Sequence, residues 1–217
     1  MFDRIKNDPF IHECYIKADD PDSKDGFWCY HGMQHVNNVI EMVEKILVQL
    51  EYDEEYIENA KIAALLHDIG YMGIKKDHEI RSYEMTKEYF RKNNIKLKYE
   101  TEILEAIKLH RDGFDSNNVM ALVLILADKT DIKKTRLAPD GYLIEGLSEY
   151  QYIDDINVIK KDNTFTVQFL INEKADKIKL EEWYFTAKVF NAIKSFANHF
   201  NFDLKILWND DEWILEK

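Results

Sequence analysis

The chain has 217 residues, a length that accommodates one domain and at most a small appendage. Hydrophobic residues make up 46% of it and there are only 7 Gly and 3 Pro, so the composition excludes a disordered chain or a long flexible linker. The 29 Lys and Arg against 41 Asp and Glu give a net charge of −12, which repels a nucleic-acid backbone or an anionic membrane. We therefore expect no nucleic-acid partner and no membrane partner.

Targeting signals are not evident in the sequence. The N-terminal residues contain no apolar core of the kind that a signal peptide needs. The longest apolar run, Val119 to Ala127, is far shorter than the roughly 20 residues that span a bilayer. We expect a cytoplasmic protein in which Cys14 and Cys29, which lack C-x-x-C spacing, are reduced structural thiols.

The first three quarters of the chain have the periodicity of α-helices. Apolar residues recur every three or four positions from 36 to 50, and a second helix is predicted over about 54–69, where Gly70 stops it. Further helices are predicted at about 78–93, 101–110 and 117–136, the last of them carrying a run of six apolar residues. Five helices around one core are the simplest arrangement.

From about residue 152 the period changes to the alternation of a half-buried strand. A β-hairpin is predicted at about 153–171, with its turn at Asp162-Asn163, followed by an amphipathic helix at about 179–200. A second short hairpin is predicted between 204–208 and 213–215. The fold class is therefore mainly α, with residues 1–140 as a helical domain and 141–217 as a small α+β appendage that packs on it.

Ligand-type residues interrupt the apolar helices. His35, the pair His67-Asp68, His110 and Asp128 place such a residue on each of four predicted helices, mostly at helix ends. An unpaired buried charge costs several kcal/mol, and a bound metal ion removes that cost. Imidazole and carboxylate are suitable ligands for Fe, Mn, Co, Ni or Zn. One histidine would prove little, but the set predicts a metal site.

Three motifs make the pattern recognisable. They are Tyr30-His31-x-x-x-His35, the run 63–70 that ends in His67-Asp68-Ile69-Gly70, and the run 126–129 that contains Asp128. Together they resemble the HD-domain superfamily of metal-dependent phosphohydrolases, whose H…HD…D pattern maps onto His35, His67, Asp68 and Asp128. The resemblance covers roughly residues 28–136 and implies a helical HD-domain fold.

Some members of that superfamily bind a second metal through two more histidines, which here would be His78 and His110. The resemblance thus implies one or two divalent ions, with Asp68 as the bridging ligand and the central catalytic residue. His35, His67 and Asp128 would complete the coordination of one ion, and His78 and His110 would complete that of the other. One departure from the family pattern is Asp77, which stands where Gly usually precedes the histidine; it could change the helix start or add a carboxylate.

Four more residues are candidates for binding substrate. Lys129 and Arg81 could neutralise phosphate oxygens, although a solvated helix face is an equally good interpretation. Asp131 lies three residues beyond Asp128 and could accept a proton or pair with Lys129. His31 lies one helical turn before His35 and has either a substrate-binding or a structural role.

The resemblance implies hydrolysis of a small-molecule phosphoester, with a nucleotide as the favoured substrate, by attack of a metal-activated hydroxide. Two alternatives stay open from the sequence. One is a mixed-valent di-iron oxygenase, because some members of the superfamily use the same ligands to activate oxygen. The other is a nucleotide sensor that keeps a structural metal without catalysis.

Overall fold

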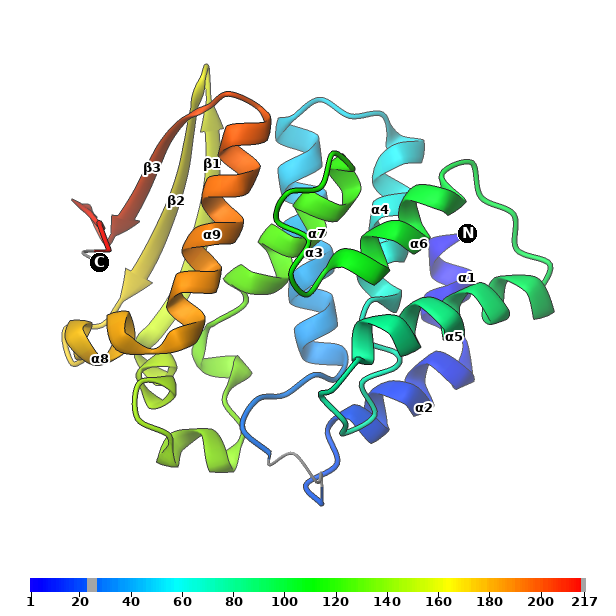
Figure 1. The fold of residues 1–217 in the computed structure, drawn as a ribbon, viewed down its shortest axis with the longest axis horizontal. Helices are drawn as coiled ribbons and strands as arrows, with labels where there is room; N and C mark the ends of the chain where they lie inside the picture. Colours follow the sequence, from blue (N-terminus) through cyan, green and yellow to red (C-terminus); the bar gives the residue numbers. More distant parts are fainter. Residues whose placement is uncertain (23–26, 216–217) are drawn as a thin grey trace.

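The structure is a computed structural model that describes residues 1–22 and 27–215. Its N-terminal part is built from α-helices that surround a central, almost wholly buried helix, α7 (Figure 1). The helices are α1 (Phe2–Lys6), α2 (Pro9–Ala18), α3 (Met33–Gln49), α4 (Glu54–Leu66), α5 (His78–Lys92), α6 (Glu100–Leu109) and α7 (Val119–Thr130).

Local sequence signals fix several of these helix starts. The Asp53 carboxylate accepts a hydrogen bond from the Tyr56 backbone N–H at 2.8 Å and so caps α4. Asp8 caps α2 in the same way and is followed by Pro9, whose fixed φ suits the first helical position. The predicted helices in this part of the chain are present, each with ends shifted by a few residues.

The two N-terminal helices were not predicted, yet they belong to the core. Ile5 and Ile11 are fully buried. The Tyr15 hydroxyl of α2 donates a hydrogen bond of 2.5 Å to the Leu65 carbonyl, in the last turn of α4. Because the last turn of α4 directly precedes His67-Asp68, α2 supports the segment that carries this pair.

The C-terminal part contains three short 3-10 helices, one sheet and two further helices. The sheet has four strands in the order β1-β2-β3-β4. The elements are η1 (Lys134–Arg136), η2 (Pro139–Leu143), η3 (Leu147–Tyr152), β1 (Ile153–Lys161), β2 (Thr164–Ile171), α8 (Lys177–Glu182), α9 (Tyr184–His199), β3 (Asp203–Trp208) and β4 (Asp211–Glu212).

Strands β1 and β2 form the predicted hairpin, with Asp162 in the left-handed region at φ 52°. The even alternation of buried and half-buried residues along β2 confirms the predicted two-residue period. Strand β3 then pairs with β2 in parallel, which requires a crossover through α8 and α9.

Three sequence predictions need correction. Helix α7 ends at Thr130, and 134–136 form a separate 3-10 helix instead of its last turn. The helix predicted at 179–200 is two helices, because Trp183 adopts an extended backbone with ψ 120° between α8 and α9. The final strand is Asp211–Glu212 in place of 213–215, and the expected pair of separate hairpins is one continuous sheet.

The sheet and the helical part pack together through α9, which lies between the strands and α7 in Figure 1. On the sheet side, Phe190 of α9 and Phe169 of β2 both contact the Trp213 ring edge to face. One continuous cluster of buried apolar side chains extends through both parts. The mainly α fold with a small C-terminal α+β part is therefore confirmed.

The side chain of Gln49, at the end of α3, contacts the outer edge of the sheet. It donates to the Val158 carbonyl at 3.2 Å and accepts from the Lys160 backbone N–H at 2.8 Å. These two groups lie on β1, whose other edge pairs with β2. No helix among the described residues is both long enough and apolar enough to cross a membrane.

Candidate metal centre

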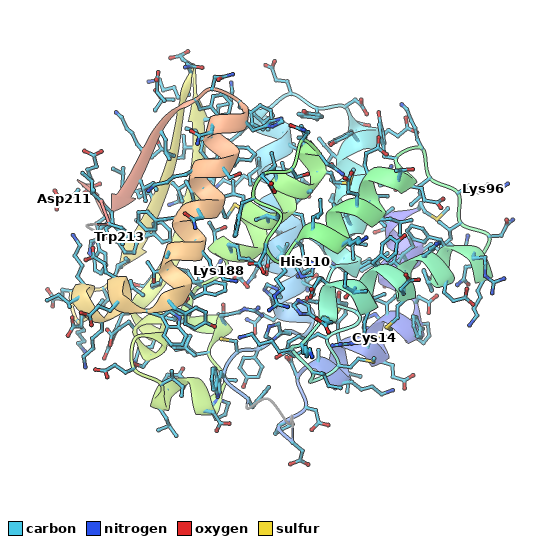
Figure 2. The ribbon with its side chains drawn as sticks, viewed as in Figure 1. Cys14, Lys96, His110, Lys188, Asp211 and Trp213 are labelled. Atoms are coloured by element: carbon cyan, nitrogen blue, oxygen red, sulfur yellow. The ribbon has the colours of Figure 1, made fainter. Side chains whose placement is uncertain are left out.

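Six of the predicted ligands come together where the ends of five helices meet. His35 lies in the first turn of α3 and His78 is the first residue of α5, whereas Asp128 lies in the last turn of α7. The others follow directly after α4 and α6. The six are His35, His67, Asp68, His78, His110 and Asp128, all buried except His78, which is half-buried. Figure 2 shows the labelled His110 near the middle of the molecule.

Each of the four histidines is oriented by a hydrogen bond at Nδ1. His67, His78 and His110 reach the backbone carbonyls of Ala64, Lys75 and Ile107, at 2.7, 2.8 and 2.7 Å. The Nδ1 atom of His35 instead reaches the Asp131 carboxylate at 2.7 Å. Because carbonyls and carboxylates accept, each Nδ1 carries a proton, which in the neutral imidazole leaves a lone pair on Nε2. The Nε2 atoms of His78 and His110 lie 3.0 Å apart.

The four Nε2 atoms gather around the two oxygens of Asp68. Oδ2 lies 3.3 Å from His67 Nε2 and 3.8 Å from His35 Nε2. Oδ1 lies 3.3 Å from His78 Nε2 and 3.4 Å from His110 Nε2. The Asp128 carboxylate joins the first group, at 3.3 Å from His35 Nε2. The Asp68 carboxylate therefore stands between two sets of ligand atoms.

These atoms fit a metal ion better than they fit one another. His35 Nε2, His67 Nε2 and Asp68 Oδ1 are buried and have no hydrogen-bond partner among the described residues. Ligand atoms of His35, His67 and Asp128 lie within 4.8 Å of one another, as do those of His67, Asp68 and His110. Buried acceptors that converge without a donor are costly, and a divalent cation would satisfy them together.

The electrostatics of the cluster favour ionised carboxylates. Burial raises the pKa of the Asp68 carboxyl, but the neighbouring histidines, His67 first, outweigh burial and hold this pKa well below its usual range. Burial also raises the pKa of Asp128, and the Lys129 ammonium with His35 more than reverses the effect. Burial lowers the pKa of His78 to about 4, so this imidazole is neutral at pH 7.

Two of the predicted substrate residues contact predicted metal ligands. Asp131 accepts hydrogen bonds from His35 and, at 3.0 Å, from the Asn38 side chain, so it fixes the His35 ring where we had expected a substrate contact. Lys129 is buried, and its ammonium lies 2.6 Å from Asp128 Oδ2, so it pairs with Asp128, whereas Asp131 was one of its possible partners from the sequence.

Arg81 also has a different environment from the one predicted. Its Nε donates to the Gly70 carbonyl at 2.8 Å, and its two Nη atoms donate to the carbonyls of Lys76 and Ile74. The guanidinium therefore closes the loop between α4 and α5. A phosphate contact by Arg81 would have to compete with these three hydrogen bonds.

The backbone conformation of Asp77 shows how this residue replaces the glycine of the family pattern. Asp77 has φ 54°, in the left-handed region that glycine adopts without strain, and its side chain makes no capping hydrogen bond to α5. The residue therefore occupies a position that suits the glycine usual in the family. The start of α5 at His78 is unchanged.

A pocket of about 440 Å³ opens beside the metal centre. His31 lines it, stacked on the Tyr71 ring at 3.7 Å, and Asp128 and Asp131 form part of its inner wall. The outer wall was not predicted, since it comes from the C-terminal part. It contains Arg136, Leu147, Tyr150, Trp183, Tyr184 and Phe185.

A helical domain whose helix ends converge on a buried cluster of four histidines and two aspartates defines the class of this protein as a candidate metalloprotein. Residues 32–133 match the HD domain, so this part of the chain is an HD domain. The resemblance that the sequence motifs indicated is therefore confirmed.

The chain was also compared with solved structures and with curated proteins. A crystal structure of a predicted HD superfamily hydrolase from an uncultured Thermotogales bacterium is 22% identical, covering 64% of this chain and 79% of that one, with a TM-score of 0.47. Among curated proteins no match was found.

Proposed function

We propose that this protein is a metal-dependent phosphohydrolase that cleaves a small-molecule phosphoester. The main support is the Asp68 carboxylate, whose two oxygens face two separate sets of histidine Nε2 atoms. Such an arrangement suits a pair of divalent ions that share one carboxylate. His35, His67 and Asp128 would hold one ion, and His78 and His110 the other.

Bound divalent ions would supply Lewis acidity and lower the pKa of a coordinated water toward about 7. The side chains of this protein orient the predicted ligands and balance their charge. Asp131 keeps the Nε2 lone pair of His35 directed at the centre. Lys129 balances the charge of Asp128 without entering the pocket wall.

The pocket supports a phosphorylated substrate with a flat organic part. Lys75, Lys76 and Arg111 line it and give it positive charge, in a chain whose net charge is −12. The aromatic side chains of Trp28 and Tyr184 line the same pocket and offer surfaces on which a ring can stack. A nucleotide, which combines phosphate with a flat base, is therefore the substrate class that we favour.

The test begins with metal analysis of protein purified without a chelator. The protein is then reconstituted with Mn²⁺ in the absence of oxygen and screened against nucleotides, cyclic dinucleotides and sugar phosphates. We expect phosphate or nucleotide release that a chelator abolishes and that Asp68→Ala lacks. Asp155→Ala, which removes a surface carboxylate paired with Lys133, is the matched control and should keep full activity.

Two outcomes would overturn the proposal in favour of the other functions that the sequence left open. Turnover only with iron, with oxygen consumed in proportion to product, would indicate an oxygenase. Nucleotide binding without turnover under any metal would indicate a sensor.

A further inference from the structure

Three polar groups in the pocket wall are buried without a partner. Arg136 Nη1, the Tyr150 hydroxyl and Trp183 Nε1 have no hydrogen-bond partner among the described residues. All three residues line the pocket beside the metal centre. Buried polar groups in folded proteins are nearly always paired, so three unpaired ones in a single cavity wall call for a ligand that pairs with them.

The three residues come from separate elements that the fold brings to the same pocket. Arg136 ends η1, Tyr150 lies in η3, and Trp183 separates α8 from α9. Segment 28–30 runs beside segment 136–138: the Tyr30 N–H donates to the Arg136 carbonyl at 2.9 Å. This pairing places Arg136 between the N-terminal and C-terminal parts of the pocket.

Arg136 lines the same pocket as Asp128 and Asp131 of the candidate metal centre. Although burial disfavours its charge, nearby groups, Cys29 first and then Asp131 and Asp128, outweigh burial and keep its pKa above the usual value. Burial raises the pKa of Tyr150, while the nearby Trp183 indole N–H and the Arg136 charge act against that rise; the Trp183 contact does not have the geometry of a hydrogen bond. Among the described residues, no carboxylate forms an ion pair with Arg136 within 4.0 Å.

The chemistry of the three groups selects their ligand. A guanidinium and an indole N–H can only donate, and a phenol readily donates. Three donors, one of them charged, match an oxygen-rich anion, and a guanidinium fits phosphate oxygens as a fork. The carboxylates in the pocket do not compete for this role, because Asp128 pairs with Lys129 and Asp131 with His35.

We propose that Arg136, Tyr150 and Trp183 form a phosphate-binding subsite that holds a phosphate group of the substrate beside the metal centre. This inference rests on the proposed function, since it takes the substrate to be phosphorylated. All three residues lie beyond the matched HD domain at 32–133, so that domain does not contain the whole substrate site. The C-terminal part thereby contributes to substrate choice.

The test measures binding of inorganic phosphate to the full-length, Mn²⁺-loaded protein by calorimetry. Three variants each remove one polar group: Arg136→Gln, Tyr150→Phe and Trp183→Phe. We expect phosphate affinity to fall about ten-fold or more for Arg136→Gln and about three- to ten-fold for the other two, because each hydrogen bond is made to a charged group. Metal content and melting temperature should stay at the wild-type values.

Matched controls lie outside the pocket. Arg91→Gln removes an exposed guanidinium that pairs with Glu88, Tyr142→Phe changes an exposed phenol, and Trp208→Phe changes an indole in β3. These three variants should bind phosphate like the wild type. Arg136→Lys, which keeps the charge and loses the fork, should bind with intermediate affinity.

Unchanged phosphate affinity in all three subsite variants would overturn the inference, as would a loss of affinity that only follows a loss of bound metal. The result is independent of turnover. A protein that hydrolyses no phosphoester but loses phosphate binding through these substitutions would refute the proposed function and still support the subsite. If Arg136→Gln does not fold, Tyr150→Phe, which removes one oxygen atom, and Trp183→Phe decide the matter.

Discussion

The hydrogen bond between Asp131 and His35 allows a quantitative test of how the metal centre is organised. The bond is 2.7 Å long, buried and charge-assisted, and the second Asp131 oxygen accepts from Asn38. Such bonds contribute about 1.5–3 kcal/mol, and about 1.4 kcal/mol corresponds to a ten-fold change in affinity. The hydrogen bond is also present in the metal-free protein. Only part of its free energy therefore contributes to the affinity for metal.

We therefore expect Asp131→Asn to weaken metal binding by about ten-fold and Asp131→Ala by up to about a hundred-fold, in the range found for groups that orient metal ligands. In the Asn variant the amide oxygen can still accept from His35 Nδ1, but the charge is lost and the NH2 group that replaces the second oxygen cannot accept from Asn38. In the Ala variant both His35 and Asn38 lose a buried partner, and the metal-free protein should be destabilised by about 2 kcal/mol.

The assay is titration with Co²⁺ in competition with a chelator of known affinity, combined with thermal unfolding of the metal-free protein. Asp155→Ala, at the surface, is the control and should bind Co²⁺ like the wild type. If Asp131→Ala binds Co²⁺ as tightly as the wild type, then Asp131 does not orient His35 for the metal and the reasoning fails.

Three other predictions address the second metal, the start of α5 and the C-terminal part. A His78→Ala/His110→Ala double variant should hold about one ion per chain where the wild type holds about two, since both side chains face Asp68 Oδ1; elemental analysis showing one ion in each would contradict this. Asp77→Gly should raise the free energy of unfolding in urea by about 0.5–1 kcal/mol, because Gly adopts a φ of 54° without strain; a decrease would mean that the carboxylate stabilises the helix start. Truncation after Arg136 should abolish cooperative thermal unfolding, because the apolar cluster extends across that point; a soluble, metal-loaded fragment that unfolds cooperatively would show the remainder to be an independent module.

The parts of the fold that could be predicted are those with a local cause. Helix α3 and strand β2 each bury one side, so the periods of 3.6 and 2 are visible in the sequence. The parallel pairing of β2 with β3 has no such signal, because it joins segments separated by the whole α8–α9 crossover. Helix α1, with five residues, is too short to show a period.

The candidate site divides in the same way. Charged and imidazole side chains at the ends of apolar helices are visible in the sequence because burying them without a partner is costly. The partners of those side chains are set by the tertiary structure: spacing alone suggested that Asp131 pairs with Lys129, whereas Asp131 reaches across to α3. Arg136 lies in a basic stretch with Lys133 and Lys134, and this stretch was the one available signal for the pocket wall.

The contact between Gln49 and β1 bears on how this chain avoids self-association. An edge strand presents backbone groups that can recruit a strand from another molecule. The Gln49 amide pairs with two of these groups as a neighbouring strand would, through the Val158 carbonyl and the Lys160 N–H. The Gln49 side chain therefore occupies backbone groups that an edge strand of a second molecule would need. The charged Lys160 and Lys161 also oppose the approach of a second copy.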